Sequence, residues 1–169
     1  PVAITVATGK AAEKGILIKS AASLELMGRV NTVVLDKTGT VTEGKPRVTD
    51  VLCAANVTEE ELLCAAASLE KPSGHPLADA IVQEAERRSI PLCAVSDFAA
   101  VAGGGVQAVQ DGKTLYAGND RYMESIGADT AALRAAAEML AAAGKTPLYF
   151  AEGQQLLGVI AVADVVKPD

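Results

Sequence analysis

The sequence predicts an α+β fold, in which an antiparallel sheet flanked by helices is inserted into an incomplete α/β domain. Short segments typical of strands are joined by turn dipeptides, Asp111-Gly112 in one hairpin and Glu152-Gly153 in another. Helical segments lie among them, marked by a capping box at Thr58 and by an alanine-rich run further on. A separate apolar run, 31–35, is followed by Asp36 and a glycine turn, as strands of open α/β sheets often are.

Residues 1–46 contribute little to the predicted sheet. Residues 1–14 can form a helix, and a turn at Gly15 leads into an extended piece at 16–18. A helical turn is expected over Ser23–Gly28 because a glycine ends it. The run 31–35 predicts a short buried strand, and the breakers Gly44-Lys45-Pro46 predict a hinge.

The rest of the chain alternates strands and helices. Thr58 and Glu61 form a capping box, and Pro76 suits the first turn of a second helix. Asn119 and Gly144 mark the start of one later helix and the end of another. The predicted strands are Val48–Cys53, Ala94–Val95, Val106–Val109, Thr114–Ala117, Pro147–Ala151 and Leu156–Ala163, and the predicted helices are those beginning at Thr58, Pro76–Arg88, Asn119–Ser125 and Thr130–Ala143.

Composition narrows the class of protein. Half of the 169 residues are apolar and 21% are charged, which suits a packed core. The net charge of -6 argues against a nucleic-acid surface, but it leaves room for a nucleotide pocket. Cys53, Cys64 and Cys93 form no C-x-x-C pair, so we expect reduced, buried structural thiols rather than metal ligands. No segment has the ~18 apolar residues of a membrane span.

The segment Asp36-Lys-Thr-Gly-Thr40 is the most informative in the chain. A carboxylate at the end of a strand can attack a phosphoryl group and carry it as an aspartyl phosphate. Lys37 could offset phosphate charge, while Thr38 and the loop at Gly39 could donate hydrogen bonds to phosphate oxygens. A strand that merely ends in an aspartate turn is the simpler interpretation, and the full pentapeptide after an apolar run argues against it.

This pentapeptide and its extension through Pro46 resemble the phosphorylation loop of P-type cation-transporting ATPases, within the haloacid-dehalogenase-like superfamily. The resemblance extends over nearly the whole chain and is strongest to the heavy-metal branch, above all to copper exporters. It implies an aspartyl phosphate on Asp36, formed from ATP, with Mg²⁺ held at Asp36 and Thr38. It also implies four segments: 1–27 as the end of a transmembrane helix and a linker, 28–45 as the first piece of the phosphorylation domain, 46–163 as the nucleotide-binding domain, and 164–169 as the truncated return.

The only histidine lies in Glu70-Lys-Pro-Ser-Gly-His75-Pro-Leu77. A lone histidine is more often structural. This segment, however, resembles the Ser-Glu-His-Pro signature of heavy-metal ATPases, in which the histidine packs against adenine. Gly74 stands where the family has Glu, so any role of that Glu is absent. Glu70 matches an acidic residue that contacts the adenine edge in the family, and an exposed Glu at a helix end is the alternative.

Three more matches concern the remaining predicted site residues. Gly103 and Gly105 resemble the family's Gly-x-Gly-Val, whose glycines would let the backbone approach a nucleotide. Gly118-Asn119 resembles another signature, in which Asn119 shapes the pocket or contacts ribose, and helix capping by Asn119 is a compatible alternative. Asp164-Val-Val-Lys167 resembles the hinge returning to the phosphorylation domain, against the simpler interpretation of a surface ion pair.

The resemblance therefore implies the ATP-binding and phosphorylation portion of a membrane pump that exports a heavy-metal ion, with Cu⁺ as the expected ion and with ATP and Mg²⁺ as cofactors. This portion would face the cytoplasm. The expected partners are ATP or ADP and, through membrane helices, the metal ion; a metallochaperone is a further candidate, and nucleic acid is not expected.

Three alternatives remain open at this point. Zinc and cadmium exporters look similar. A soluble phosphatase of the same superfamily would place a second Asp where this chain has Thr38. A nucleotide-binding module without turnover describes the chain taken alone, which we expect to bind nucleotide weakly and not to hydrolyse it.

Overall fold

The computed structural model describes residues 2–167, and they divide into two compact units, the first ending at Asp36 and the second beginning at Lys37. The first unit contains α1 (Val2–Glu13) and α2 (Ala21–Met27), and Ser20 caps α2 by accepting a hydrogen bond from the Ser23 amide. Both predicted helical segments are thus confirmed. No helix among residues 2–167 is both long and apolar enough to cross a membrane. Of the predicted segments, the first residue of 1–27 and the last two of 164–169 lie outside the described residues.

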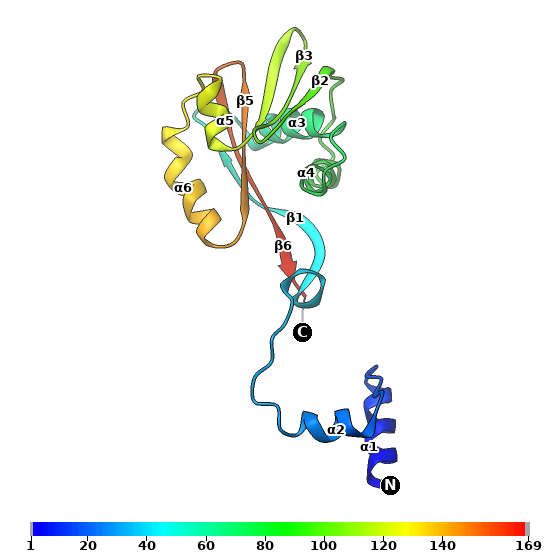
Figure 1. Ribbon diagram of the computed structural model, residues 1–169. Coiled ribbons are helices and arrows are strands. Elements are labelled where there is room, and N and C mark those ends of the chain that lie inside the picture. The colour runs from blue at the N-terminus through cyan, green and yellow to red at the C-terminus, as the bar shows by residue number, and fades with distance from the viewer. Residues whose placement is uncertain (1, 168–169) are drawn as a thin grey trace. The chain divides into compact units, whose positions relative to one another are not determined.

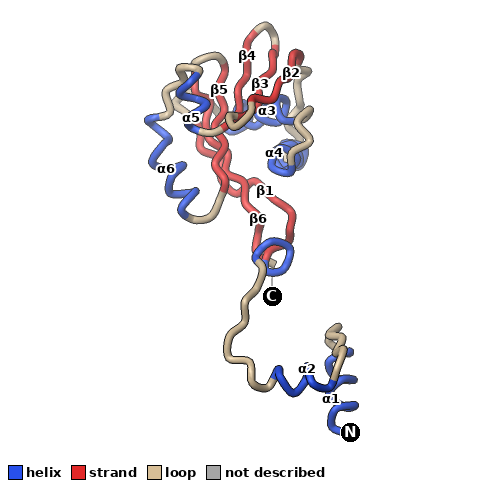
Figure 2. Tube along the Cα trace, in the orientation of Figure 1, coloured by secondary structure: helices blue, strands red, loops and turns tan. Residues whose placement is uncertain are grey.

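The predicted strand at 31–35 does not form. Residues 30–36 are irregular, as the loop after α2 in Figure 2 shows. Val34 is 92% exposed, and its apolar neighbours Val33 and Leu35 are exposed too. The six described strands form one sheet, and this segment pairs with none of them. A lone apolar segment cannot satisfy its backbone donors and acceptors as a strand, so its β propensity is not expressed.

The second unit is an antiparallel sheet covered by helices, as predicted. Its strand order is β1-β6-β5-β4-β3-β2, and every neighbouring pair is antiparallel. The strands are β1 (Thr42–Cys53), β2 (Ser96–Val101), β3 (Gly105–Gln110), β4 (Lys113–Gly118), β5 (Thr146–Glu152) and β6 (Gln155–Val166). The helices are α3 (Glu59–Glu70), α4 (Pro76–Arg87), α5 (Asp120–Ser125) and α6 (Ala131–Ala142).

Helices cover both faces of this sheet (Figure 1). On one face α3 and α4 pack against residues such as Phe150 and Ile160. On the other face α5 and α6 pack against Tyr149 and Val159. Neighbouring residues of β5 and β6 thus contribute to opposite cores, as the two-residue period of a strand requires. Burial on both faces fixes the register of the central strands.

All six strands differ from their predicted bounds, and the starts of β1 and β2 are the most informative differences. β2 begins at Ser96 rather than Ala94, because the preceding segment is held to α3 through a hydrogen bond from the Cys93 amide to Ser68 Oγ. β1 begins at Thr42 and includes the Gly44-Lys45-Pro46 breakers. Gly44 has a φ of +71°, and the β1–β6 register shifts between Thr42 and Pro46. The breakers therefore produce an irregularity within the strand and not its end.

Candidate functional site

A cavity of about 580 Å³ lies where α3 ends, α4 begins and the turn between β2 and β3 approaches the end of β4. Its size falls in the usual range for small-molecule pockets. Six residues singled out in the sequence line it together: Glu70, His75, Gly103, Gly105, Gly118 and Asn119. Segments far apart in the chain are thus brought to one hollow. The rest of the wall is largely apolar, with Leu77, Ala78, Ala100, Val101, Val106, Ala117 and Leu148.

Glu70 is the last residue of α3 and only 7% exposed. The alternative of an exposed helix-end Glu is therefore wrong. Burial raises the pKa of Glu70 to about 7, and a hydrogen bond with the Ser73 side chain opposes that rise. A carboxyl group that titrates near neutral pH can donate a hydrogen bond as well as accept one.

His75 caps α4 at its N-terminus. Its Nδ1 accepts a hydrogen bond from the Leu77 amide at 3.2 Å, and Pro76 occupies the first turn. The Nδ1 edge of the ring is therefore used by the helix cap, and the Nε2 edge is not. Gly74 has a φ of +63°, a conformation that favours glycine over the family's Glu. The structural and ligand interpretations of His75 are thus compatible, since capping uses only one edge of the ring.

The glycines have two different roles. Gly105 and Gly118 are paired across β3 and β4. A Cβ on Gly105 would lie 1.9 Å from the Ala117 carbonyl oxygen, and one on Gly118 would lie 2.4 Å from that of Gly104. Close strand packing therefore requires these two glycines, which the sequence-based interpretation as ligand contacts missed. Gly103 differs, because its φ is +70° and nothing would obstruct a Cβ.

Asn119 joins the glycine turn to α5. Its Oδ1 accepts from the Tyr122 amide at 2.8 Å, which makes it the N-cap. Its Nδ2 donates to the Gly103 carbonyl at 3.0 Å, and its own amide donates to the Gly104 carbonyl. Helix capping by Asn119 is thus confirmed, and the same side chain holds the turn that lines the cavity. A contact with ribose stays a prediction.

A second group of predicted residues surrounds the turn at Lys37–Val41. The Asp164 carboxylate accepts hydrogen bonds from Thr42 Oγ1 and from the Gly44 amide. Thr42 is 2% exposed, and its hydroxyl also accepts from the Gly39 amide. Lys167 Nζ donates to the Gly39 carbonyl at 2.8 Å. Asp164 and Lys167 therefore hold this turn and do not form the surface ion pair considered as an alternative. Thr42 was not singled out from the sequence.

Asp36, Lys37 and Thr38 are exposed, and Asp36 is the last residue of the first unit. Gly39 has a φ of +78°, which permits the tight turn that follows. No cluster of three or more His, Cys, Asp or Glu residues suited to a metal exists among residues 2–167. The oxygen donors of Asp36 and Thr38 suit Mg²⁺ better than a transition metal, because Mg²⁺ commonly binds through one or two carboxylates, waters and phosphate oxygens.

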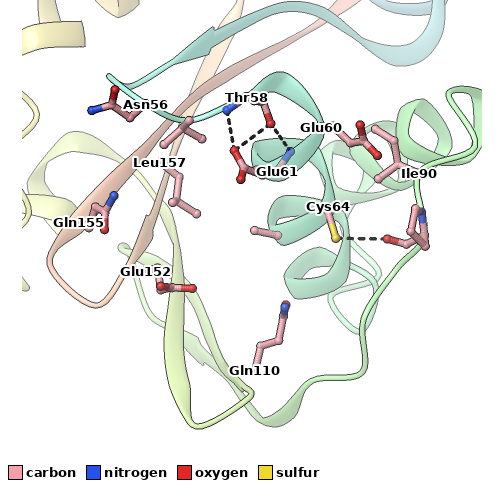
Figure 3. Close-up of a pocket in the computed structure, with 13 residues that line it drawn as sticks. Asn56, Thr58, Glu60, Glu61, Cys64, Ile90, Gln110, Glu152, Gln155 and Leu157 are labelled. Carbon is pink, nitrogen blue, oxygen red and sulfur yellow. Dashed lines mark hydrogen bonds between the residues drawn. The ribbon is translucent and has the colours of Figure 1, made fainter.

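A second cavity of about 630 Å³ lies elsewhere in the second unit (Figure 3). Glu60, Glu61 and Glu152 line it, together with Gln110 and Cys64. Glu61 is engaged in the capping box with Thr58, which confirms that prediction, and Glu152 pairs with Lys113. Acidic side chains repel phosphate groups. The slightly larger cavity is therefore the poorer candidate for a nucleotide.

Known proteins resemble this chain over nearly its whole length. The chain is 45% identical to a copper-transporting P-type ATPase of Rhizobium leguminosarum bv. viciae and 47% identical to the probable copper-transporting ATPase PacS of Synechococcus elongatus. Each match covers 99% of this chain but only 20% and 23% of the relative. The chain thus spans about a fifth of the length of these relatives.

A solved structure of a zinc-transporting PIB-type ATPase in its E2.Pi state superposes with a TM-score of 0.87 at 36% identity. The superposition covers 98% of this chain and 27% of that protein. The family model described as haloacid dehalogenase-like hydrolase matches residues 30–169, which is most of the chain. The chain belongs to the haloacid dehalogenase-like hydrolase family, and nearly all of its own length is similar to a part of heavy-metal P-type ATPases.

Proposed function

We propose that this chain is the ATP-binding and phosphorylation-loop portion of a membrane pump that exports a heavy-metal ion at the expense of ATP. The observation that carries the proposal is the 580 Å³ cavity, which gathers six separately predicted residues in the unit that follows Asp36 directly in the chain. Similarity to copper-transporting P-type ATPases over 99% of the chain supports it. We assign 46–163 to the nucleotide-binding domain, 28–45 and 164–169 to the phosphorylation domain, and 1–27 to a membrane-helix end and linker.

The lining of the cavity fits a purine nucleotide. Its apolar wall, including Val106 and Leu148, suits the faces of an adenine ring. Glu70, with its pKa near 7, can both donate to and accept from the polar edge of the base. The His75 ring can pack against the base while its Nδ1 keeps the helix cap. The turn at Gly103 presents backbone without a side chain, so phosphate or ribose can approach it closely.

Asp36 is the proposed phosphoryl acceptor. Its carboxylate oxygen attacks the γ-phosphorus of the substrate ATP, the bond to the bridging oxygen breaks, and ADP leaves. Lys37 offsets phosphate charge. Asp36 and Thr38 would hold Mg²⁺ together with phosphate oxygens, and the bound ion supplies neutralisation of charge at this site. Asp164, Thr42 and Lys167 hold the turn that follows Asp36, which makes them positioning residues.

The proposed ion is Cu⁺, because the curated relatives at 45% and 47% identity are copper transporters. The zinc-transporting neighbour, at 36% identity, is the basis of the alternative. The proposed location is a cell membrane, with this portion on the cytoplasmic side. A soluble phosphatase is disfavoured by Thr38, since that enzyme class needs an acid and base at this position.

The test is acid-stable labelling of the whole pump with γ-³²P-ATP. We expect a hydroxylamine-sensitive phosphate in the wild type and none in Asp36→Asn, while nucleotide affinity is retained. A pump that cycles normally with the Asp36→Asn substitution would overturn the proposal. The 169-residue chain itself should bind ATP or ADP in the roughly micromolar-to-millimolar range of enzyme sites. It should show no turnover, and no label on Asp36.

A further inference from the structure

Two cysteines that are 29 positions apart in sequence face each other in the second unit. Cys64 lies in the middle of α3, and Cys93 lies in the segment between α4 and β2. Their Sγ atoms are 3.9 Å apart. The sequence-based expectation of buried thiols is wrong for Cys93, which is exposed, while Cys64 is partly buried. Spacing along the chain carries no sign of the pair, because only the packing of this segment onto α3 creates it.

Hydrogen bonds hold the sulfur of Cys64 and the backbone of Cys93. Cys64 Sγ donates a hydrogen bond to the Pro91 carbonyl at 3.2 Å, and Figure 3 shows the sulfur directed at that oxygen. The Cys93 amide donates to Ser68 Oγ at 2.9 Å. Cys64 and Ser68 are one helical turn apart, so both anchor the same short segment to one face of α3. Packing of this segment onto α3 therefore brings the two sulfur atoms to 3.9 Å without any ligand.

Small ions can reach the pair from solvent. Cys93 is exposed, and Cys64 lines the 630 Å³ cavity of Figure 3. Burial raises the pKa of the Cys64 thiol, and the Glu60 carboxylate, on the same helix and in the same cavity, adds to that rise. The same negative charge favours a cation over an anion beside the pair. Cys53, the remaining cysteine, lies on β1 and is partly buried.

We infer that Cys64 and Cys93 form a two-thiolate site that binds one soft monovalent metal ion such as Cu⁺. Two metal–sulfur bonds of the ~2.3 Å length known for zinc thiolates span roughly 4.6 Å when collinear, slightly more than the separation seen here. Thiolates select soft ions such as Cu(I). No third His, Cys, Asp or Glu completes a cluster among residues 2–167, so the four protein ligands of a structural zinc site are not available.

Binding needs no oxidant or reductant. As each sulfur bonds to the ion, its S–H bond breaks and the proton passes to solvent, while the metal remains monovalent. The bound ion would join α3 to the 91–93 segment, and α3 ends at Glu70 in the nucleotide pocket. The site thus adds a soft-ion contact to the nucleotide-binding unit, and the inference stands whether or not Asp36 accepts phosphate.

The experiment is an anaerobic titration of the reduced chain with Cu⁺ against a chromogenic Cu⁺ chelator. We expect one ion per chain at the pair, two sulfur neighbours by X-ray absorption, and a higher apparent Tm on binding. Cys64→Ser and Cys93→Ser should each lower the affinity by at least about tenfold, which is the smallest loss typical of removing even an outer-shell partner. Cys53→Ser is the matched control and should bind as the wild type does.

Several results would overturn the inference. One is a Cys53→Ser variant that loses as much Cu⁺ affinity as the other two variants. Another is Cu⁺ binding that survives the loss of either paired cysteine. The third is an X-ray absorption spectrum without two sulfur ligands. Counting free thiols before and after the titration separates ion binding from disulfide formation. Loss of two thiols without bound copper would identify the pair as a redox couple instead. Circular dichroism and nucleotide affinity of each variant establish that it is folded.

Discussion

The cavity proposed to bind nucleotide and the segment that carries Asp36 differ in how much of their environment this chain supplies. Around the cavity, the residues already have structural roles: His75 and Asn119 cap helices, and Gly105 lets two strands meet. Residues 30–36, by contrast, are irregular, and Val34 is almost fully exposed. A cavity can therefore be complete within one sheet and its helices, whereas an apolar segment such as 31–35 needs neighbouring strands to hold it as a strand.

The turn at Lys37–Val41 is intermediate between these two cases. Asp164 and Lys167, from the far end of the chain, hold it by hydrogen bonds. These contacts lie within the second unit and close the long β1–β6 ribbon at the end that carries the turn (Figure 1).

The largest effect is expected from Gly105→Ala. Its Cβ would lie 1.9 Å from the Ala117 carbonyl oxygen, so β3 and β4 must separate. We expect a loss of at least about 3 kcal/mol in the free energy of unfolding, measured in urea. Gly103→Ala is the control and should cost only about 1 kcal/mol, through its positive φ. Equal losses in the two variants would contradict the assignment of a packing role to Gly105.

Glu70→Gln should change the pH dependence of stability. The folded-state pKa of about 7 lies above the ordinary 4.5, so the native state binds this proton more tightly than the unfolded chain does. The cost of burying the ionised carboxylate is absent below pH 4.5 and complete above pH 7. At pH 8 the variant should be more stable than the wild type by up to about 3 kcal/mol, with little difference at about pH 4.

Glu84→Gln should change the stability at high pH in the opposite direction to Glu70→Gln. Hydrogen bonds with Arg87 lower the pKa of Glu84, with help from Arg88. The ionised form therefore stabilises the fold above its ordinary pKa, and that contribution is lost as the pH falls through the lowered value. This variant should be less stable than the wild type at about pH 8. A Glu70→Gln variant that behaves the same way would show that the buried Glu70 carboxylate does not destabilise the fold.

Asp164→Ala should loosen the turn that follows Asp36. Removing the carboxylate takes an acceptor from Thr42 Oγ1 and from the Gly44 amide, which we expect to cost about 1–2 kcal/mol locally. Hydrogen exchange should accelerate at the Gly39 and Gly44 amides. Amides of α3 serve as the internal control and should be unaffected. Unchanged exchange at Gly44 would contradict the positioning role of Asp164.

The smallest change in stability is expected from His75→Ala, which removes the cap of α4 at about 1 kcal/mol. Nucleotide affinity should also fall by about tenfold, equivalent to about 1.4 kcal/mol. His75→Asn separates the two roles, because Asn is a good cap without an imidazole ring. We expect Asn at this position to restore stability but not affinity. Wild-type affinity in the Asn variant would remove the ring from the site.

Much of the fold could be predicted because its signals are local. The capping box at Thr58, Pro76 in a first turn and the Asp111-Gly112 hairpin each fix an element through neighbouring residues. The strand at 31–35 failed for the complementary reason, since β structure depends on partners that local sequence does not reveal.

The site shows the same division. Glu70 and His75 could be named from a short motif, but the burial that raises the pKa of Glu70 comes from tertiary packing. Leu148 joins the cavity wall from a strand far away in sequence, and the Cys64–Cys93 pair is invisible to spacing rules. Such contacts follow from the arrangement of elements and carry no signature of their own.

The most direct measurement is a titration of ¹⁵N-labelled chain with ADP and with ATP, followed by NMR. If nucleotide occupies the cavity between α3, α4 and the glycine turn, amide shifts should concentrate at Glu70, His75, Gly103 and Asn119. The acidic cavity of Figure 3, near Glu60 and Gln110, should be silent. Shifts confined to that second cavity, or no shifts at millimolar nucleotide, would show that nucleotide does not bind between α3, α4 and the glycine turn.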